Sequence, residues 1–149
     1  MARDGFRSNA RIGGRPFYPL LVAFAISCFL GTLATDIAYW RTADMMWADF
    51  SDWLVTAGVV VGYVAILLTL IEVFGLPSGR LRRPSWPYVI GNIVTLILAT
   101  LNMLVHTRDA WTSVVPWGVV LSAAVVVIAL VTGGVTRETF APRSAEVTA

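Results

Sequence analysis

The sequence contains one cysteine, one histidine and little charge, and each of these shortages excludes a class of protein. The single cysteine, Cys28, rules out an internal disulfide and argues against a thiolate-ligated metal centre within one chain. Charged residues make up 13% of the chain, whereas a soluble domain carries roughly 25%. The net charge of +2 is small and scattered. Nucleic acid is therefore not an expected partner.

Hydrophobic residues are abundant instead, at 57% of the 149 residues. Four apolar runs are long enough to cross a bilayer, which takes about 20 helical residues, and they cover residues 19–39, 53–74, 88–106 and 113–135. Barrel strands would alternate apolar and polar residues, and these runs do not. No cleavage site of the small-x-small type follows the first run, so we expect it to be retained as a membrane helix.

We therefore predict an all-α polytopic membrane protein, built as an antiparallel four-helix transmembrane bundle. Residues 19–135 would form the transmembrane domain, between an arginine-bearing tail at 1–18 and a second tail at 136–149. All eleven basic residues are arginines, and nine of them lie in the two tails and the second connection. By the positive-inside rule both termini should be cytoplasmic.

Small and polar residues recur every three or four positions in each run and form one line along each helix, which we call its seam. Small residues let helices approach closely in lipid, and polar residues bond across the interface. The seams comprise Ser27, Gly31, Ala34 and Ala38; Gly58, Gly62, Ala65, Thr69 and Glu72; Tyr88, Asn92, Thr95, Ala99, Asn102 and His106; and Gly118, Ser122, Val125, Ala129, Thr132 and Thr136. We expect Gly31, Gly58, Gly62 and Gly118 to mark close helix contacts.

Matching depths in the bundle predict a buried polar cluster of Glu72, Tyr88, Asn92 and Thr132 in the cytoplasmic half. Glu72 marks a proton or cation pathway, or else it is an interfacial carboxylate bonded to Asn92, Tyr88 or a nearby arginine. Both interpretations remain open from the sequence.

Three polar residues are expected on the outer side: Asp36, Asn102 and His106. Around the first helix, Asp36 lies about 180° from the seam residue Ser27. Its side chain would therefore either reach the headgroup region or face a partner subunit. His106 alone cannot supply the two axial ligands that a transmembrane haem commonly needs. No cofactor, metal site or catalytic constellation is expected.

The segment Tyr18-Pro19-Leu20-Leu21-Val22-Ala23-Phe24-Ala25 resembles the first-helix motif of a bacterial family of small four-helix membrane proteins of unknown function. That motif reads His-Pro-Leu, a valine, then His-Phe-Pro, and both histidines are replaced in this chain. The family's aspartate near the end of that helix corresponds to Asp36, and its glycine pair after the fourth helix to Gly133-Gly134. Its third helix often opens with a histidine four residues before an asparagine, where this chain has Tyr88 and Asn92. The resemblance covers roughly residues 15–140 and implies the fold and a membrane location.

The function we expect is that of a non-catalytic accessory or structural subunit, which packs in the lipid bilayer against other membrane-protein subunits or copies of itself. Two alternatives stay open. One is a membrane anchor of a redox complex, associated with quinone or haem. The other is a small oligomeric proton-coupled transporter working through Glu72 or Asp36.

Overall fold

The computed structural model describes the backbone of residues 17–75, 86–107 and 114–140, and the side chains of 20–71, 86–107 and 114–134. The described backbone forms four long helices: α1 (Phe17–Thr42), α2 (Met45–Gly75), α3 (Trp86–His106) and α4 (Val119–Phe140). A short irregular segment, η1 (Val114–Gly118), leads into α4. The described ranges contain no strand.

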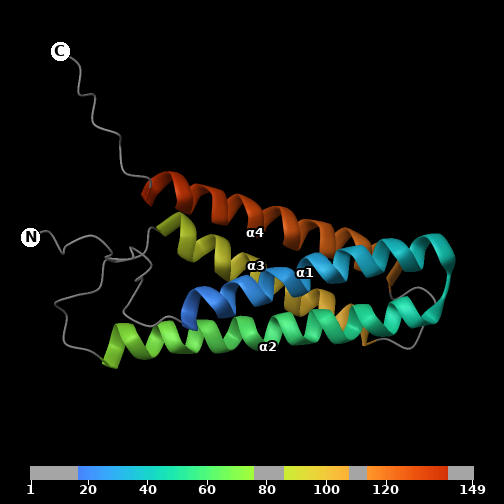
Figure 1. Ribbon diagram of the computed structural model, residues 1–149, viewed down its shortest axis with the longest axis horizontal. Coiled ribbons are helices and arrows are strands. Elements are labelled where there is room, and N and C mark those ends of the chain that lie inside the picture. The colour runs from blue at the N-terminus through green and yellow to red at the C-terminus, as the bar shows by residue number, and fades with distance from the viewer. Residues whose placement is uncertain (1–16, 76–85, 108–113, 141–149) are drawn as a thin grey trace, which may run out of the picture.

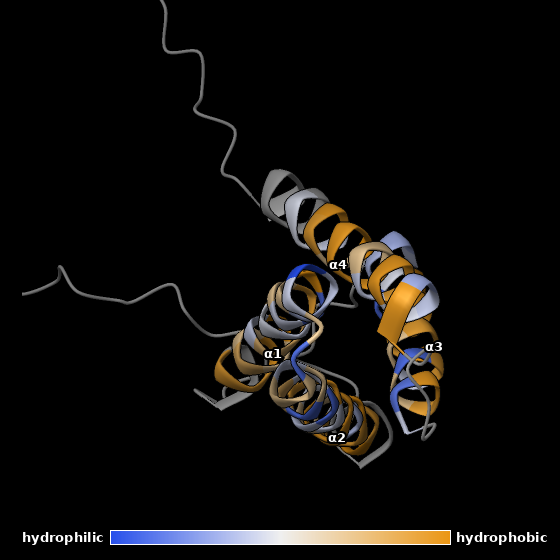
Figure 2. Ribbon diagram, turned by 90° about the vertical axis from the view of Figure 1, so that its right-hand side faces the viewer, coloured by the Kyte–Doolittle hydropathy of each residue, from blue (hydrophilic) through white to orange (hydrophobic). Residues whose placement is uncertain are grey.

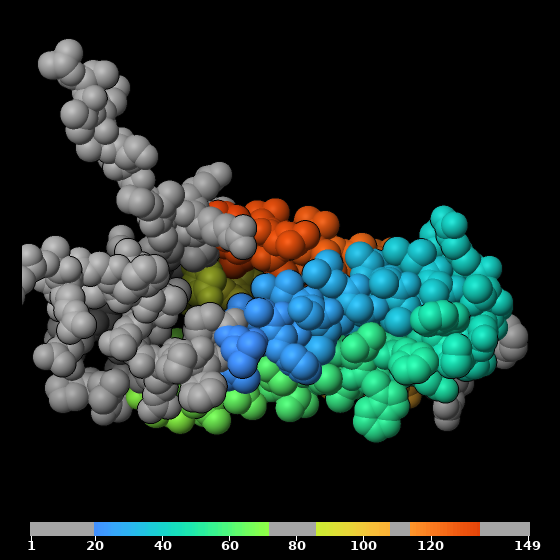
Figure 3. Space-filling view, in the orientation of Figure 1, coloured from blue at the N-terminus to red at the C-terminus, as the bar shows by residue number. Residues whose placement is uncertain are grey.

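The four helices run antiparallel and form a closed ring in which each packs against its neighbours in sequence, and α4 packs against α1 (Figures 1 and 2). On the side of the molecule that Figure 3 shows, α1 lies between α4 and α2 and touches both. Each helix is long and apolar enough to cross a membrane. These findings confirm the predicted all-α four-helix membrane bundle. We call the end with the α1–α2 connection the turn end, and the opposite end the terminal end.

The first connection is much shorter than the sequence suggested. Residues 40–52 were expected to link two spans, but α2 begins at Met45, so Ala43 and Asp44 alone separate it from α1. Ala43 adopts a positive φ of 54° to make the turn. The Asp44 side chain then caps α2, because its Oδ1 accepts a hydrogen bond from the Met46 amide at 3.0 Å.

The outer surface is apolar, and the interior combines a core of apolar side chains with buried polar ones. Figure 2 shows hydrophobic residues dominating the outer faces of the helices. The core consists of Ala25, Phe29, Val55, Val59, Ala99, Val125 and Val126. This distribution suits a lipid solvent, in which close packing and hydrogen bonding, rather than burial of apolar surface, hold helices together.

The seams of α3 and α4 face the interior as expected, since Thr95, Ala99, Ser122, Val125 and Ala129 are all buried. In α2, Gly58 and Ala65 are buried, and Gly62 and Thr69 are half-buried.

The predicted seam of α1 was right only in part, since Gly31 and Ala38 are half-buried. Ser27 and Ala34 are exposed, and the buried face carries Ala25, Cys28, Phe29, Thr32, Asp36 and Tyr39. The reason is a close fit between α1 and α2, because a Cβ on Gly58 would come within 2.6 Å of the Phe29 ring. The glycine on α2 makes room for a large residue on α1, so the small face of α1 is not needed there. Ser27 can lie on the outer face because its hydroxyl is satisfied within α1, where it donates to the Ala23 carbonyl at 2.9 Å.

The other expected packing glycines occupy different settings. Gly62 faces Leu96, whose Cδ2 would lie 2.6 Å from an added Cβ. Gly31 faces the flexible end of Leu54, and Gly118 is buried within η1. A close contact that the sequence analysis missed lies at Gly91, where an added Cβ would collide with the Thr132 side chain.

Candidate functional site

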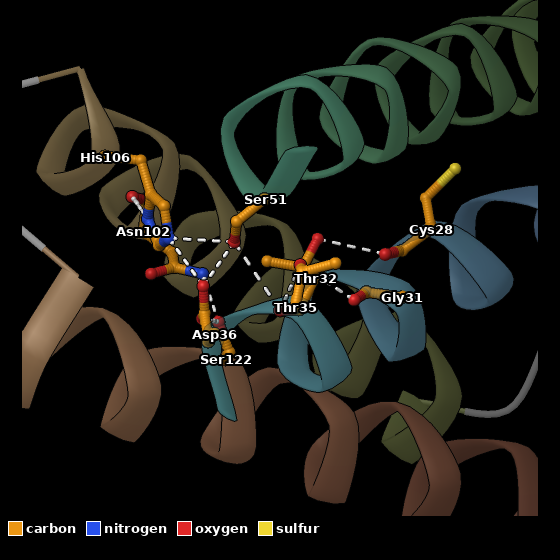
Figure 4. A network of polar contacts seen from close by, with 9 residues as sticks. All are labelled: Cys28, Gly31, Thr32, Thr35, Asp36, Ser51, Asn102, His106 and Ser122. Atoms are coloured by element: carbon orange, nitrogen blue, oxygen red, sulfur yellow. Dashed lines mark hydrogen bonds and ion pairs between the residues drawn. The ribbon is translucent and has the colours of Figure 1, made fainter. Parts of the chain in front are cut away.

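A cluster of polar side chains occupies the interior near the turn end, and each of the four long helices contributes to it (Figure 4). It consists of Asp36 from α1, Ser51 from α2, Asn102 and His106 from α3, and Ser122 from α4, and we call it the Asp36 cluster. Asp36 and Ser51 are 0% exposed, and Asn102 and Ser122 are 1% exposed. The cluster is therefore closed off from both lipid and water.

The Asp36 carboxylate is the common acceptor of the cluster. Its Oδ1 accepts from the Ser51 hydroxyl and lies 2.9 Å from His106 Nε2. Its Oδ2 accepts from the Ser122 hydroxyl at 2.5 Å. Both oxygens are thus satisfied by side chains from the three other helices, which offsets the cost of placing a carboxylate inside a bundle.

The hydrogen bonds of His106 determine where its protons lie. Nδ1 is 2.9 Å from the Asn102 backbone carbonyl, which can only accept, so Nδ1 carries a hydrogen. One further proton then lies between Nε2 and Asp36 Oδ1.

Ser51 and Asn102 complete the network around this pair. The Ser51 hydroxyl oxygen lies 3.1 Å from His106 Nε2 as well as bonding to Asp36. The Asn102 amide donates to Ser122 Oγ at 2.8 Å, while Ser122 passes its own hydrogen to Asp36. This series of hydrogen bonds runs from amide to hydroxyl to carboxylate. Each bond polarises the donor of the next one and so strengthens that next hydrogen bond.

One buried atom of the cluster has no partner in the described part of the chain: Asn102 Oδ1. Outside the cluster, Oδ1 of Asp52, next to Ser51 on α2, is also buried without a hydrogen-bond partner among the described residues. Among the described residues, no group of three or more His, Cys, Asp or Glu side chains gathers as a metal site would require.

Asp36 was expected at the headgroup region or against a partner subunit, and this expectation was wrong. The rotation of α1 that fits Phe29 against Gly58 also turns Asp36 inward, toward α3 and α4. Asn102 and His106 lie at the turn end, opposite the start of α3. The structure thus brings the three expected outer-side residues together as one hydrogen-bonded group.

The other predicted cluster lies in the terminal half. Tyr88, Asn92 and Thr132 line one cavity there. Asn92 Nδ2 donates to the Tyr88 backbone carbonyl at 2.8 Å. The Glu72 side chain lies outside the described residues, although α2 includes its backbone.

Sequence reasoning missed Ser51 and did not select Ser122 as a site residue. Ser122 was already on a predicted seam, so its polarity at a buried depth was an available signal. Ser51 lies in the segment expected as a connection, and its helical context was not apparent from the apolar run.

The fold and the buried cluster together define an all-α membrane protein with four spanning helices. The chain belongs to the family described as predicted membrane protein (DUF2231), whose model matches residues 14–138. This match confirms the predicted resemblance to a family of membrane proteins of unknown function. No curated protein and no solved structure shows significant similarity to the chain.

Proposed function

We propose that this protein is a non-catalytic accessory subunit of the bacterial inner membrane, which packs as a rigid four-helix unit against other membrane proteins. The observation that carries this proposal is the closure of the Asp36 cluster. Both carboxylate oxygens bond within the chain, and the side chains of Asp36 and His106 are 0% and 1% exposed.

A carboxylate that carries a proton or cation across a membrane needs a route to water on each side at some stage. Asp36, on α1, is bonded to one side chain from each of the three other helices. Such an arrangement favours a structural role, because opening it would leave a buried charge without partners. The transporter alternative therefore has less support than the subunit.

The outer surface supports a role in packing. Large apolar side chains such as Leu67, Ile97 and Val127 are more than half exposed on α2, α3 and α4. In a membrane these faces meet either acyl chains or the apolar helices of another subunit. The partner is either a second copy of this chain or a different subunit.

The arginine distribution supports cytoplasmic termini. Nine arginines lie in the tails and the second connection, against two in the other connections. A reporter that is active only in the cytoplasm should be active when fused after Ala149 and inactive when inserted between Ala43 and Asp44. The opposite pattern would contradict this orientation.

The subunit proposal is tested by extracting the protein at its natural level in a mild detergent and measuring native mass. We expect a discrete complex of fixed stoichiometry, and subunit identification would separate a homo-oligomer from a mixed one. In a strain lacking this chain, the remaining partner should lose stability. Variants of the Asp36 cluster should affect the complex in proportion to the amount of folded protein. A lone monomer at natural level would contradict the proposal.

A further inference from the structure

The terminal half of the bundle contains a partly open cavity of about 230 Å³, whose walls come from α1, α2, α3 and α4. Near this end, Figure 3 shows α3 between α1 and α4. Most of the lining is apolar, including Ala25, Phe29, Ile66 and Leu96. The cavity is separate from the Asp36 cluster, none of whose members lines it.

The size of the cavity indicates the size of ligand it can take. An apolar cavity of about 150 Å³ in another protein stays dry and binds benzene. The present cavity is larger, so it has room for a substituted ring. Since its walls are apolar, a ring would be bound better than water.

Polar side chains on α3 and α4 make one side of the mostly apolar cavity polar. Tyr88, Asn92 and Thr132 all line it, and they belong to the first turns of α3 and the later turns of α4. A lipid acyl chain has no donor or acceptor that could form hydrogen bonds with polar side chains. A ring that carries oxygen substituents could pack one face on the apolar walls while an oxygen bonds to Asn92 at the polar side.

Asn92 is the side chain best suited to recognise such an oxygen. One hydrogen of Nδ2 is used by the Tyr88 carbonyl, which leaves a second hydrogen on Nδ2 and the Oδ1 acceptor. Among the described residues, the bond from Nδ2 to the Tyr88 carbonyl is the one hydrogen bond that involves the Asn92 side chain. A carboxamide can therefore donate to a quinone carbonyl and accept from a quinol hydroxyl.

We propose that this cavity binds a membrane-soluble isoprenoid quinone, with its ring between the helices and one ring oxygen at Asn92. The proposal concerns binding and involves no electron transfer. It is independent of the accessory role, because it can be measured on the isolated chain without any partner.

The test uses the full chain in nanodiscs of defined phospholipids and a photoreactive azidoquinone, with labelled residues mapped by peptide mass spectrometry. We expect saturable labelling of peptides that line the cavity, competed by decylubiquinone and not by oleate. Labelling spread over exposed positions such as Leu67 and Ile97, without saturation, would overturn the proposal. A photoreactive fatty acid in a parallel sample distinguishes a slot for acyl chains, which would also overturn it.

Two variants sharpen the result. Ala25→Leu fills the cavity and should reduce quinone labelling roughly tenfold, since an added side chain competes for the same volume. Ala23→Leu makes the same change two residues away on the exposed face of α1 and should leave labelling unchanged.

Asn92→Leu retains volume but removes both hydrogen-bonding groups. We expect roughly five- to tenfold weaker quinone labelling, the effect of one lost hydrogen bond, with fatty-acid labelling unchanged. Unchanged quinone labelling in Asn92→Leu would contradict the assigned orientation and reduce the site to an apolar slot. Thermal unfolding of each variant, followed separately, shows whether a loss of labelling reflects a loss of fold.

Discussion

His106 Nε2 lies 2.9 Å from Asp36 Oδ1, although 70 positions separate the two residues in the chain. The pair joins α1 to α3, which are diagonal rather than adjacent in the ring of helices (Figure 2). Ser51 and Ser122 reach the same carboxylate from α2 and α4, the other diagonal. One carboxylate thus holds all four helices at a common depth.

The first prediction concerns the charge of Asp36. Asp36→Asn keeps the shape but removes the acceptor that faces His106, and breaking a buried pair in this way costs about 3–5 kcal/mol. We expect the unfolding temperature to fall by on the order of 10 °C. The single cysteine, Cys28, is 5% exposed, so its reaction with a thiol-specific dye reports unfolding.

Asp49→Asn is the matched control for this change, because Asp49 is exposed near the same end of the bundle. It should unfold at the temperature of the parent protein. Equal stability of Asp36→Asn and the parent would show that the carboxylate contributes nothing to holding the helices.

The second prediction concerns the coupling of Asp36 to His106. His106→Gln should destabilise by a similar amount, because it leaves Asp36 without its nearest positive or proton-sharing partner. The double variant Asp36→Asn, His106→Gln should be more stable than the sum of the single effects by about 0.5–3 kcal/mol. The measurement is a double-mutant cycle of unfolding free energies, and strict additivity would mean that the contact carries no energy.

The third prediction concerns the two serines that differ in burial. Ser122→Ala removes the donor to Asp36 Oδ2 and the acceptor of the Asn102 amide, so we expect a loss of about 1–3 kcal/mol. Ser27→Ala is the control, since Ser27 is exposed and bonds only to its own helix. Denaturant or thermal unfolding in detergent compares them, and a Ser122→Ala effect no larger than that of Ser27→Ala would rule out a stabilising role for Ser122.

The fourth prediction concerns the glycines that allow helices to touch. Gly58→Ala brings a Cβ to 2.6 Å from the Phe29 ring, and overpacking of this kind costs about 1–3 kcal/mol. Gly91→Ala should cost at least as much, because its Cβ would lie 3.0 Å from the Thr132 Cβ, which cannot move without its helix.

Gly134→Ala serves as the control for both, since no atom lies within 4 Å of its added Cβ. It should unfold at or slightly above the parent temperature, because alanine favours helix more than glycine does. Comparable destabilisation at all three glycines would show that collision with Phe29 and Thr132 does not govern the effect.

Much of the fold was accessible from the sequence because spanning a bilayer is a local requirement. Each apolar run had to be long enough by itself, and the seams of α3 and α4 could be followed because small and polar residues recur at helical spacing. The same reasoning failed in part on α1. There, Phe29 occupies space that Gly58 leaves on a different helix, and no property of α1 alone reveals that space.

The candidate site was predicted in part for the same reason. Asn102 and His106 lie on one helical seam, so their common face was visible in the spacing. Ser51 lies 15 positions from Asp36, in a segment expected as a connection, and Ser122 lies 86 positions away.

By itself, the sequence determined that this chain has four membrane-spanning helices, because hydrophobic length and the cost of unpaired backbone groups in lipid leave few alternatives. The rotation of each helix about its axis was decided by the tertiary structure. That rotation depends on which side chains meet across the bundle, and it is what placed Asp36 among donors from three other helices instead of at the surface.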